Sequence, residues 1–111
     1  MTRICRGTTP DITCRVLFDL DDYECMFTIG AKPLKPYFTV RDERITRHKE
    51  DGYTYLTFTL TQDETLSCKA GNALAQRRAV KGPNSENAVA SVYLPVEIID
   101  IVKDGVIYHA E

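Results

Sequence analysis

The fold follows from residues 53–60, Tyr53-Thr54-Tyr55-Leu56-Thr57-Phe58-Thr59-Leu60, in which apolar and hydroxyl-bearing side chains alternate. Because successive side chains of a strand point to opposite faces, this period of two is that of a half-buried strand. Asp51-Gly52 before it is a turn signal. Thr61-Gln62-Asp63-Glu64 after it has the spacing of a capping box, so we predict a short helical turn near 62–67.

The same alternation recurs in the first half of the chain. Two strands are predicted there, with inward faces formed by Ile12, Cys14, Val16 and Phe18 and by Tyr23, Cys25, Phe27 and Ile29. A third strand, over residues 36–41, turns Phe38 and Val40 inward, and Pro33 and Pro36 favour an edge position or a bulge for it. Residues 44–49 are expected to form an exposed ribbon.

The second half of the chain is less regular. Residues 73–80 have a helix-favouring composition but β-rich neighbours and flanking glycines, and we predict a strand. Residues 81–87 are rich in turn formers, which indicates a mobile loop. After it, inward positions are expected at Ala88, Ala90, Val92 and Leu94. Pro95 is expected to interrupt this strand, which resumes over 96–102.

These elements predict one domain over residues 1–111. About seven short strands with recurring turn signals and one helical turn are typical of an all-β, antiparallel β-sandwich with immunoglobulin-like character. A chain of 111 residues is long enough to bury roughly two-thirds of its unfolded surface in one core. The chain contains no tryptophan, so the usual sequence hallmarks of antibody domains are absent.

The composition and net charge do not indicate a particular binding partner. The net charge is −2 and the hydrophobic fraction is 43%, so no long-range field attracts nucleic acid or an anionic membrane. The sequence has neither a signal-peptide core near its start nor a run of about 18 apolar residues. We therefore expect a protein that is made and kept in the cytosol.

The four cysteines are expected to be free thiols. Cys5, Cys14, Cys25 and Cys68 match neither a metal-binding knuckle nor a small disulfide scaffold. Cys14 and Cys25 fall on the apolar phase of their predicted strands, so they are interpreted as small buried hydrophobic residues.

Residues that could carry chemistry are few, and no catalytic, cofactor or metal site is predicted. His48 lies in a charged stretch and His109 lies close to residue 111, and no serine-hydrolase, P-loop or HExxH motif occurs. The carboxylates Asp19, Asp21, Asp22 and Glu24 do not follow the calcium-loop pattern and are interpreted as solvated turn residues. Gln76-Arg77-Arg78 lacks interleaved aromatic residues and is interpreted as a solvated strand face.

The tyrosines are the most suggestive surface feature. Tyr37, Tyr53 and Tyr55 fall on the outward phase of their strands and form the candidate interface. Tyrosine combines a large contact area with a polar tip and is enriched at protein interfaces. The alternative is that cross-strand Tyr and Thr pairs only stabilise a sheet face.

Four stretches together resemble a known group of proteins: Arg6-Gly7-Thr8-Thr9-Pro10, Phe18-Asp19-Leu20-Asp21, the residues 59–65 and the residues 99–107. They resemble small prophage proteins of Firmicutes from tail and structural-gene regions, which are similar to the immunoglobulin-like N-terminal domains of phage baseplate upper proteins. Residues 73–80 depart from the resemblance, because the family would have a more β-branched strand there, ahead of an Asp-Gly hairpin.

The resemblance implies a structural role and no catalytic residues or cofactors. It implies a sandwich, made in the bacterial cytoplasm and carried in the virion tail, that docks other phage structural proteins or copies of itself through sheet edges or an exposed face. The alternative function is a carbohydrate-binding module, with Tyr37, Tyr53 and Tyr55 as a stacking platform and Arg41 as a polar neighbour.

Overall fold

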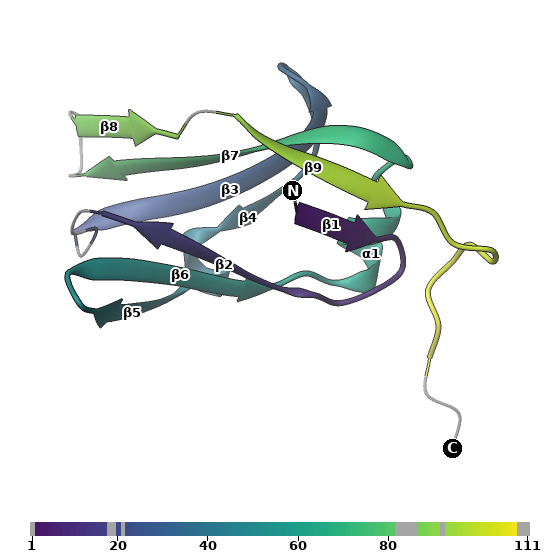
Figure 1. Cartoon of the computed structure of the whole chain (residues 1–111), viewed down its shortest axis with the longest axis horizontal. Helices are drawn as coiled ribbons and strands as arrows, with labels where there is room; N and C mark the ends of the chain where they lie inside the picture. The colour runs from purple at the N-terminus through teal and green to yellow at the C-terminus, as the bar shows by residue number, and fades with distance from the viewer. Residues whose placement is uncertain (1, 18–19, 21, 82–86, 92, 109–111) are drawn as a thin grey trace.

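The computed structural model describes residues 2–17, 20, 22–81, 87–91 and 93–108. These residues form nine strands, one 3-10 turn and one short α-helix (Figure 1). Their bounds are β1 (Thr2–Cys5), β2 (Asp11–Val16), β3 (Tyr23–Lys32), β4 (Lys35–Arg41), η1 (Asp42–Arg44), β5 (Thr46–Glu50), β6 (Tyr53–Thr59), α1 (Gln62–Leu66), β7 (Gly71–Lys81), β8 (Asn87–Ala90) and β9 (Leu94–Ile99).

The strands form two sheets that pack face to face, as Figure 1 shows. One sheet has the order β1-β9-β7-β3-β4, with β8 added to β7, and the other has the order β2-β6-β5. The predicted all-β sandwich is confirmed. The smaller sheet has the B-E-D order found in immunoglobulin-like sandwiches. One pairing departs from the antiparallel prediction, because β1 runs parallel to β9.

The stretch that predicted the fold is the central strand of the smaller sheet. Leu56 and Phe58 of β6 are buried, and so is Leu60 just after the strand. The pairing of β6 with β2 sets Ile12 opposite Phe58 and Cys14 opposite Leu56, so the apolar residues of both strands share the inner face. The alternation read from the sequence is confirmed.

The two sheets meet in an aromatic contact at the centre of the core. Phe27 of β3 and Phe58 of β6 have ring centroids 4.8 Å apart and an angle of 50° between ring planes. Burial of a phenylalanine side chain contributes about 1.5–3 kcal/mol, and such an aromatic pair adds about 0.5–1.5 kcal/mol. Ile29 and Val40 are fully buried beside this contact.

The predicted helical turn is α1. The Thr61 hydroxyl accepts a hydrogen bond from the Glu64 amide at 3.1 Å, and the Glu64 carboxylate accepts one from the Thr61 amide at 2.9 Å. This reciprocal capping box satisfies two amides that a helix start leaves unpaired. The chain crosses here from β6 in one sheet to β7 in the other, and buried Thr65 donates its hydroxyl to the Thr8 carbonyl at 2.9 Å.

The ambiguous stretch 73–80 is confirmed as a strand, because it lies within β7. That strand pairs with β3 on one side and with β9 on the other, and its inward residues Ala73, Ala75 and Ala79 are buried. Helix propensity differs between ordinary residues by less than about 0.7 kcal/mol per residue. Pairing on both edges and burial of one face therefore decide its conformation.

The edge predicted from the two prolines is β4. This strand ends the larger sheet, and its pairing with β3 shifts register at Gly30, opposite Pro36. A Cβ atom at position 30 would lie 2.6 Å from the Lys35 carbonyl oxygen, so only glycine fits. The prediction of an edge or a bulge is confirmed in both respects.

Two strands near the ends of the larger sheet were not predicted correctly. β1 was missed, because only Ile4 is buried in its four residues and no period is visible in so short a stretch. β8 forms, but Ala88 and Ala90 are exposed where inward positions were expected. Among the described residues, this strand pairs only with β7. Val92, Phe18 and most of the predicted 81–87 loop lie outside the described residues.

The last predicted strand has different bounds. β9 begins at Leu94, so Pro95 lies inside it and does not interrupt it, and it ends at Ile99 rather than Val102. Val96 and Ile98 are buried as the alternation requires. After the strand, the Asp100 carboxylate accepts a hydrogen bond from the Ile101 amide at 2.9 Å, so this amide is satisfied without pairing in the sheet.

We expect Gly30→Ala to lower the free energy of unfolding by about 1–3 kcal/mol, because the added methyl group meets backbone atoms that cannot move independently. Chemical denaturation measures the effect. Ala31→Ser, at the exposed neighbouring position, is the control and should change stability by less than about 0.5 kcal/mol. Equal stability of the two variants would show that the β3–β4 bulge does not require glycine.

Candidate functional site

The residues after β9 expose apolar side chains. We call residues 100–108 the tail segment; it leaves the end of β9 and runs away from the sheets in Figure 1. Val102 is fully exposed, Tyr108 is 86% exposed and Ile107 is 72% exposed. Contact between apolar side chains and water is unfavourable, so these three residues of one segment are candidates for contact with another molecule.

Arg6 fastens the first half of the tail segment. Its guanidinium bonds Asp100 at 2.8 Å and Asp104 at 3.1 Å. It also donates to the Cys68 carbonyl at 2.8 Å and to the Leu66 carbonyl at 3.0 Å, at the end of α1. The hydrogen bond to Asp100 raises the pKa of Arg6 and lowers the pKa of Asp100. One side chain thus joins the loop after β1, α1 and the tail segment.

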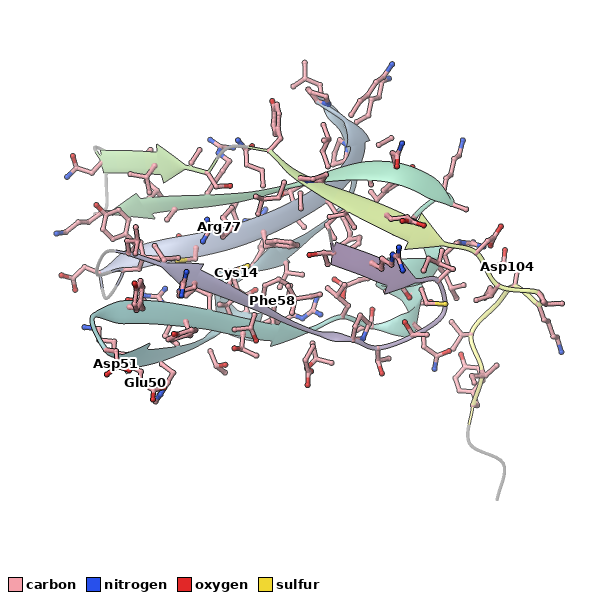
Figure 2. The ribbon with its side chains drawn as sticks, in the orientation of Figure 1. Cys14, Glu50, Asp51, Phe58, Arg77 and Asp104 are labelled. Carbon is pink, nitrogen blue, oxygen red and sulfur yellow. The ribbon has the colours of Figure 1, made fainter. Side chains whose placement is uncertain are left out.

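Gln62 fastens the second half. Its side-chain amide donates to the Ile107 carbonyl at 3.0 Å, and its side-chain carbonyl accepts from the Ile107 amide at 2.9 Å. The Gln62 side-chain amide thus pairs with the Ile107 backbone as a neighbouring strand would, through one donated and one accepted bond. The tail segment is therefore held at Asp100, Asp104 and Ile107, while the side chains of Val102, Ile107 and Tyr108 stay in solvent. Figure 2 places Asp104 at the opposite end of the molecule from Glu50 and Asp51.

A second ion pair holds α1 against the smaller sheet. The Arg44 guanidinium makes two bonds of 2.7 Å to the Glu64 carboxylate and one of 2.9 Å to the Thr59 carbonyl. The hydrogen bond from Arg44 lowers the pKa of Glu64, and the same bond raises the pKa of Arg44. Because Gln62 belongs to α1, this pair also supports the attachment of the tail segment.

The predicted ribbon over 44–49 is not exposed throughout, because Ile45 is buried in the core. Its Arg47 side chain is half-buried. It donates to the carbonyl groups of Leu20 and Tyr23 and to the Asp42 carboxylate. Asp42 also accepts a hydrogen bond from the Cys25 amide at 2.9 Å. Arg47 is therefore a structural link between β5 and β3 rather than a solvated side chain.

The three candidate interface tyrosines do not form one surface. Tyr53 and Tyr55 lie on the outer face of β6, as predicted, with ring centroids 6.4 Å apart and planes inclined by 59°. The Arg15 guanidinium lies over the Tyr53 ring, 4.7 Å from its centroid. Tyr37 lies in β4 of the other sheet, half-buried against the core. The structure thus brings two of the tyrosines together and separates the third.

Candidate catalytic and metal-ligating residues are scattered. His48 is exposed, with its Nε2 3.4 Å from a Glu50 carboxylate oxygen. His109, Asp19 and Asp21 lie outside the described residues, and Asp22 and Glu24 are exposed. Within the described ranges, no group of three His, Cys, Asp or Glu side chains is placed to hold a metal ion.

The cysteines are free thiols, as expected. Cys25 and Cys68 are buried, whereas Cys14 is half-buried because β2 is an edge strand. Burial raises the pKa of Cys14, Cys25 and Cys68 above the ordinary thiol value, and the charge of Arg77 partly offsets the shift at Cys14. These thiols are neutral at physiological pH and are poor nucleophiles.

The basic stretch 76–78 is not a uniform solvated face. Arg78 is exposed, but Arg77 lies on the inward phase of β7, between Ala75 and Ala79, and is half-buried. The period of two along β7 was sufficient to place Arg77 on this face, whereas its charge suggested solvent.

Residues of the tail-segment site were missed at the sequence level. Arg6 and Gln62 lie 94 and 45 residues from the partners that they hold, and no local pattern links such positions. No protein-family model matches this chain, and no curated protein matches it. None of the helices within the described ranges is long and apolar enough to span a membrane.

We expect the Arg44–Glu64 pair to make stability depend on pH. Glu64→Gln keeps a capping-box residue but removes the charge, and it should lower the free energy of unfolding by about 1 kcal/mol at pH 7. Because the pKa of Glu64 is lowered in the folded chain, the contribution is present above the ordinary value of 4.5 and is lost as pH falls through the folded value. Denaturation of both proteins from pH 7 to pH 3 should show the difference shrinking below about pH 4.5. A difference independent of pH would contradict the ion-pair interpretation.

We expect Arg6→Gln to release the tail segment while the sandwich stays folded. The variant loses the bonds to Asp100 and Asp104, so the Ile101 and Gly105 amides should exchange with solvent faster. Hydrogen exchange measured by NMR, together with the melting temperature, separates local release from global unfolding. Arg3→Gln, which removes only an exposed ion pair with Glu97, is the control and should leave this exchange unchanged.

Proposed function

We propose that this chain is a non-enzymatic structural protein of a phage or prophage, associated with the tail or baseplate, and that it acts through protein–protein contacts. It is made in the bacterial cytoplasm and carried in the virion. Its partners are other phage structural proteins or copies of itself. The sequence resemblance to prophage tail-region proteins supports the phage assignment.

The tail segment carries the contact role in this proposal. Val102, Ile107 and Tyr108 are held in solvent by polar bonds from Arg6 and Gln62. Soluble proteins usually have few exposed apolar side chains outside their binding sites, because exposed apolar area promotes association. A segment that is fastened and apolar presents a pre-ordered surface, which reduces the entropy lost on binding.

The alternative, carbohydrate binding through the tyrosines, has less support. Stacking of a sugar ring needs an open aromatic face, but Arg15 already covers Tyr53, and the Tyr53 and Tyr55 rings are inclined by 59°. Tyr37 belongs to the other sheet, so it adds nothing to a joint platform. A glycan array on which the chain shows no binding would remove this alternative.

We expect the chain to self-associate through the tail segment. Light-scattering chromatography over a concentration series should give a mass that rises to a dimer or a larger species, and Val102→Asp combined with Ile107→Asp should return it to the 12.6 kDa monomer. Leu34→Asp, at a position that is 97% exposed in the β3–β4 turn, is the control and should leave the association intact.

Two results would contradict the proposed contact role. One is a chain that stays monomeric at every concentration and does not bind co-encoded proteins of the phage tail in a pull-down. The other is an association, with itself or with those proteins, that the double substitution in the tail segment does not weaken.

A further inference from the structure

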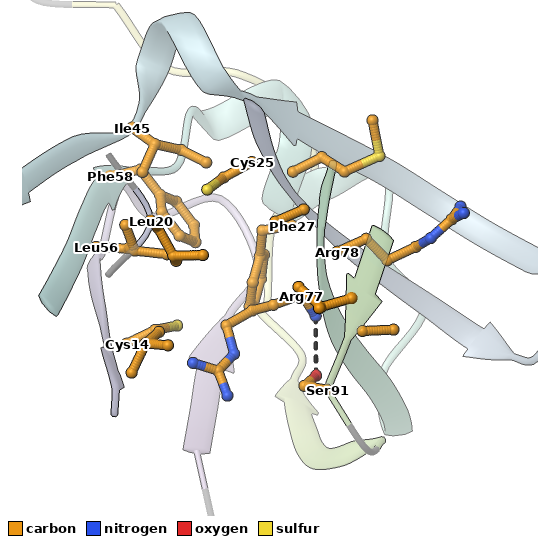
Figure 3. A pocket seen from close by; sticks show the side chains of 15 residues that line it. Cys14, Leu20, Cys25, Phe27, Ile45, Leu56, Phe58, Arg77, Arg78 and Ser91 are labelled. Atoms are coloured by element: carbon orange, nitrogen blue, oxygen red, sulfur yellow. Dashed lines mark hydrogen bonds between the residues drawn. The ribbon is translucent and has the colours of Figure 1, made fainter. Parts of the chain in front are cut away.

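An apolar cavity of about 310 Å³ lies between the two sheets, beside β8 (Figure 3). Leu56 and Phe58 of β6 line one side, and Phe27 of β3 and Ala79 of β7 line the other. β8 contributes Val89 and Ala90 to its outer wall, and Ser91, just after the strand, lines it as well. A cavity of this size falls at the lower end of the 300–1,000 Å³ typical of small-molecule sites.

Small side chains and missing pairing leave this space open. β7 turns the small side chain of Ala79 into this cavity beside Arg77, where a larger residue would fill the gap between the sheets. β2 and β8 form no pairing with each other, so the sandwich is not closed by hydrogen bonds along this side. The exposed β8 strand is the boundary between the cavity and solvent.

Arg77 extends into this opening. Figure 3 shows its guanidinium beside Cys14, below the apolar side chains of Leu56 and Phe58. Its backbone amide donates to the Ser91 hydroxyl at 3.0 Å, and one guanidinium nitrogen donates to the Arg15 carbonyl at 3.2 Å. A second cavity of about 240 Å³, on the side of Ile12 and Leu94, is lined by the same arginine.

The hydrogen-bonding capacity of the Arg77 guanidinium is only partly used. Its Nε is buried without a hydrogen-bond partner, and no ion pair with Arg77 occurs among the described residues. The Cys14 thiol beside it is neutral, since burial raises its pKa, so it supplies no countercharge. A guanidinium placed at a low-dielectric opening with an unused donor is unfavourable unless an anion pairs with it.

We propose that this cavity binds an apolar carboxylic acid, such as a medium-chain fatty acid, with its carboxylate on Arg77 and its hydrocarbon chain between the sheets. The guanidinium geometry matches a carboxylate, and the cavity wall is apolar. An engineered cavity of about 150 Å³ holds a benzene-sized molecule, so the space here suits a chain of roughly ten carbon atoms. This inference does not depend on the proposed structural function.

The test compares two ligands that differ only in the head group. Isothermal titration of the whole chain with decanoate and with decanol, below the concentration at which decanoate forms micelles, should show about tenfold tighter binding of decanoate. Arg77→Gln should abolish that preference and leave the affinity for decanol unchanged. Arg78→Gln removes the same charge from the neighbouring exposed position, and it should keep the preference.

A second measurement uses the unmodified chain, so it does not depend on the folding of the Arg77→Gln variant. Decanoate should shift the backbone NMR signals of Ala79, Val89 and Ala90, which line the cavity. Signals that shift only in the tail segment would overturn the proposal, as would equal affinities for the two ligands or an Arg77→Gln variant that keeps the preference. Val102→Asp combined with Ile107→Asp, which tests the contact role, should leave decanoate binding intact, so the two proposals fail separately.

Discussion

The contact between Phe27 and Phe58 is the interaction on which the structure depends. It joins the central strand of the smaller sheet to a strand paired on both sides in the larger one, with ring centroids 4.8 Å apart. The strands on either side take their inward residues from the same alternation, so a shift of one register position would expose the whole apolar set. Loss of this contact would remove packing at the centre of the core that also buries Ile29, Val40 and Leu60.

The same core is not fully packed along one side, where a cavity lies beside β8 and contains the guanidinium of Arg77. Alanines on the inner face of β7 and an unpaired gap beside β8 leave the cavity, and Arg77 occupies the inward position between two of those alanines. An isolated guanidinium lowers the stability of a core, whereas a paired one can be neutral or favourable. The placement of Arg77 is therefore easier to explain as part of a binding site than as part of the packing.

Ion pairs and hydrogen bonds hold α1 and the tail segment, which have little contact with the hydrophobic core. Arg6 holds α1 and the tail segment, Gln62 holds Ile107, and Arg44 holds Glu64 of the same helix. These bonds connect residues that are far apart in sequence and lie at one end of the sandwich. They keep three apolar side chains in solvent, a geometry suited to contact with another protein chain.

The sequence by itself determined the all-β class, the inward faces of β3 and β6, the edge strand with its prolines and the capped turn α1, because each depends on neighbours within a few residues. It also identified the two tyrosines that lie together on β6. Only the tertiary structure decided the parallel pairing of β1, the end of β9 and the ion pair between Arg6 and Asp100. A strand of four residues carries no readable period, and an ion pair across 94 residues exists only when the fold brings its partners to one place. Local periodicity therefore determines the layers of this protein, whereas long-range polar pairing determines its candidate sites.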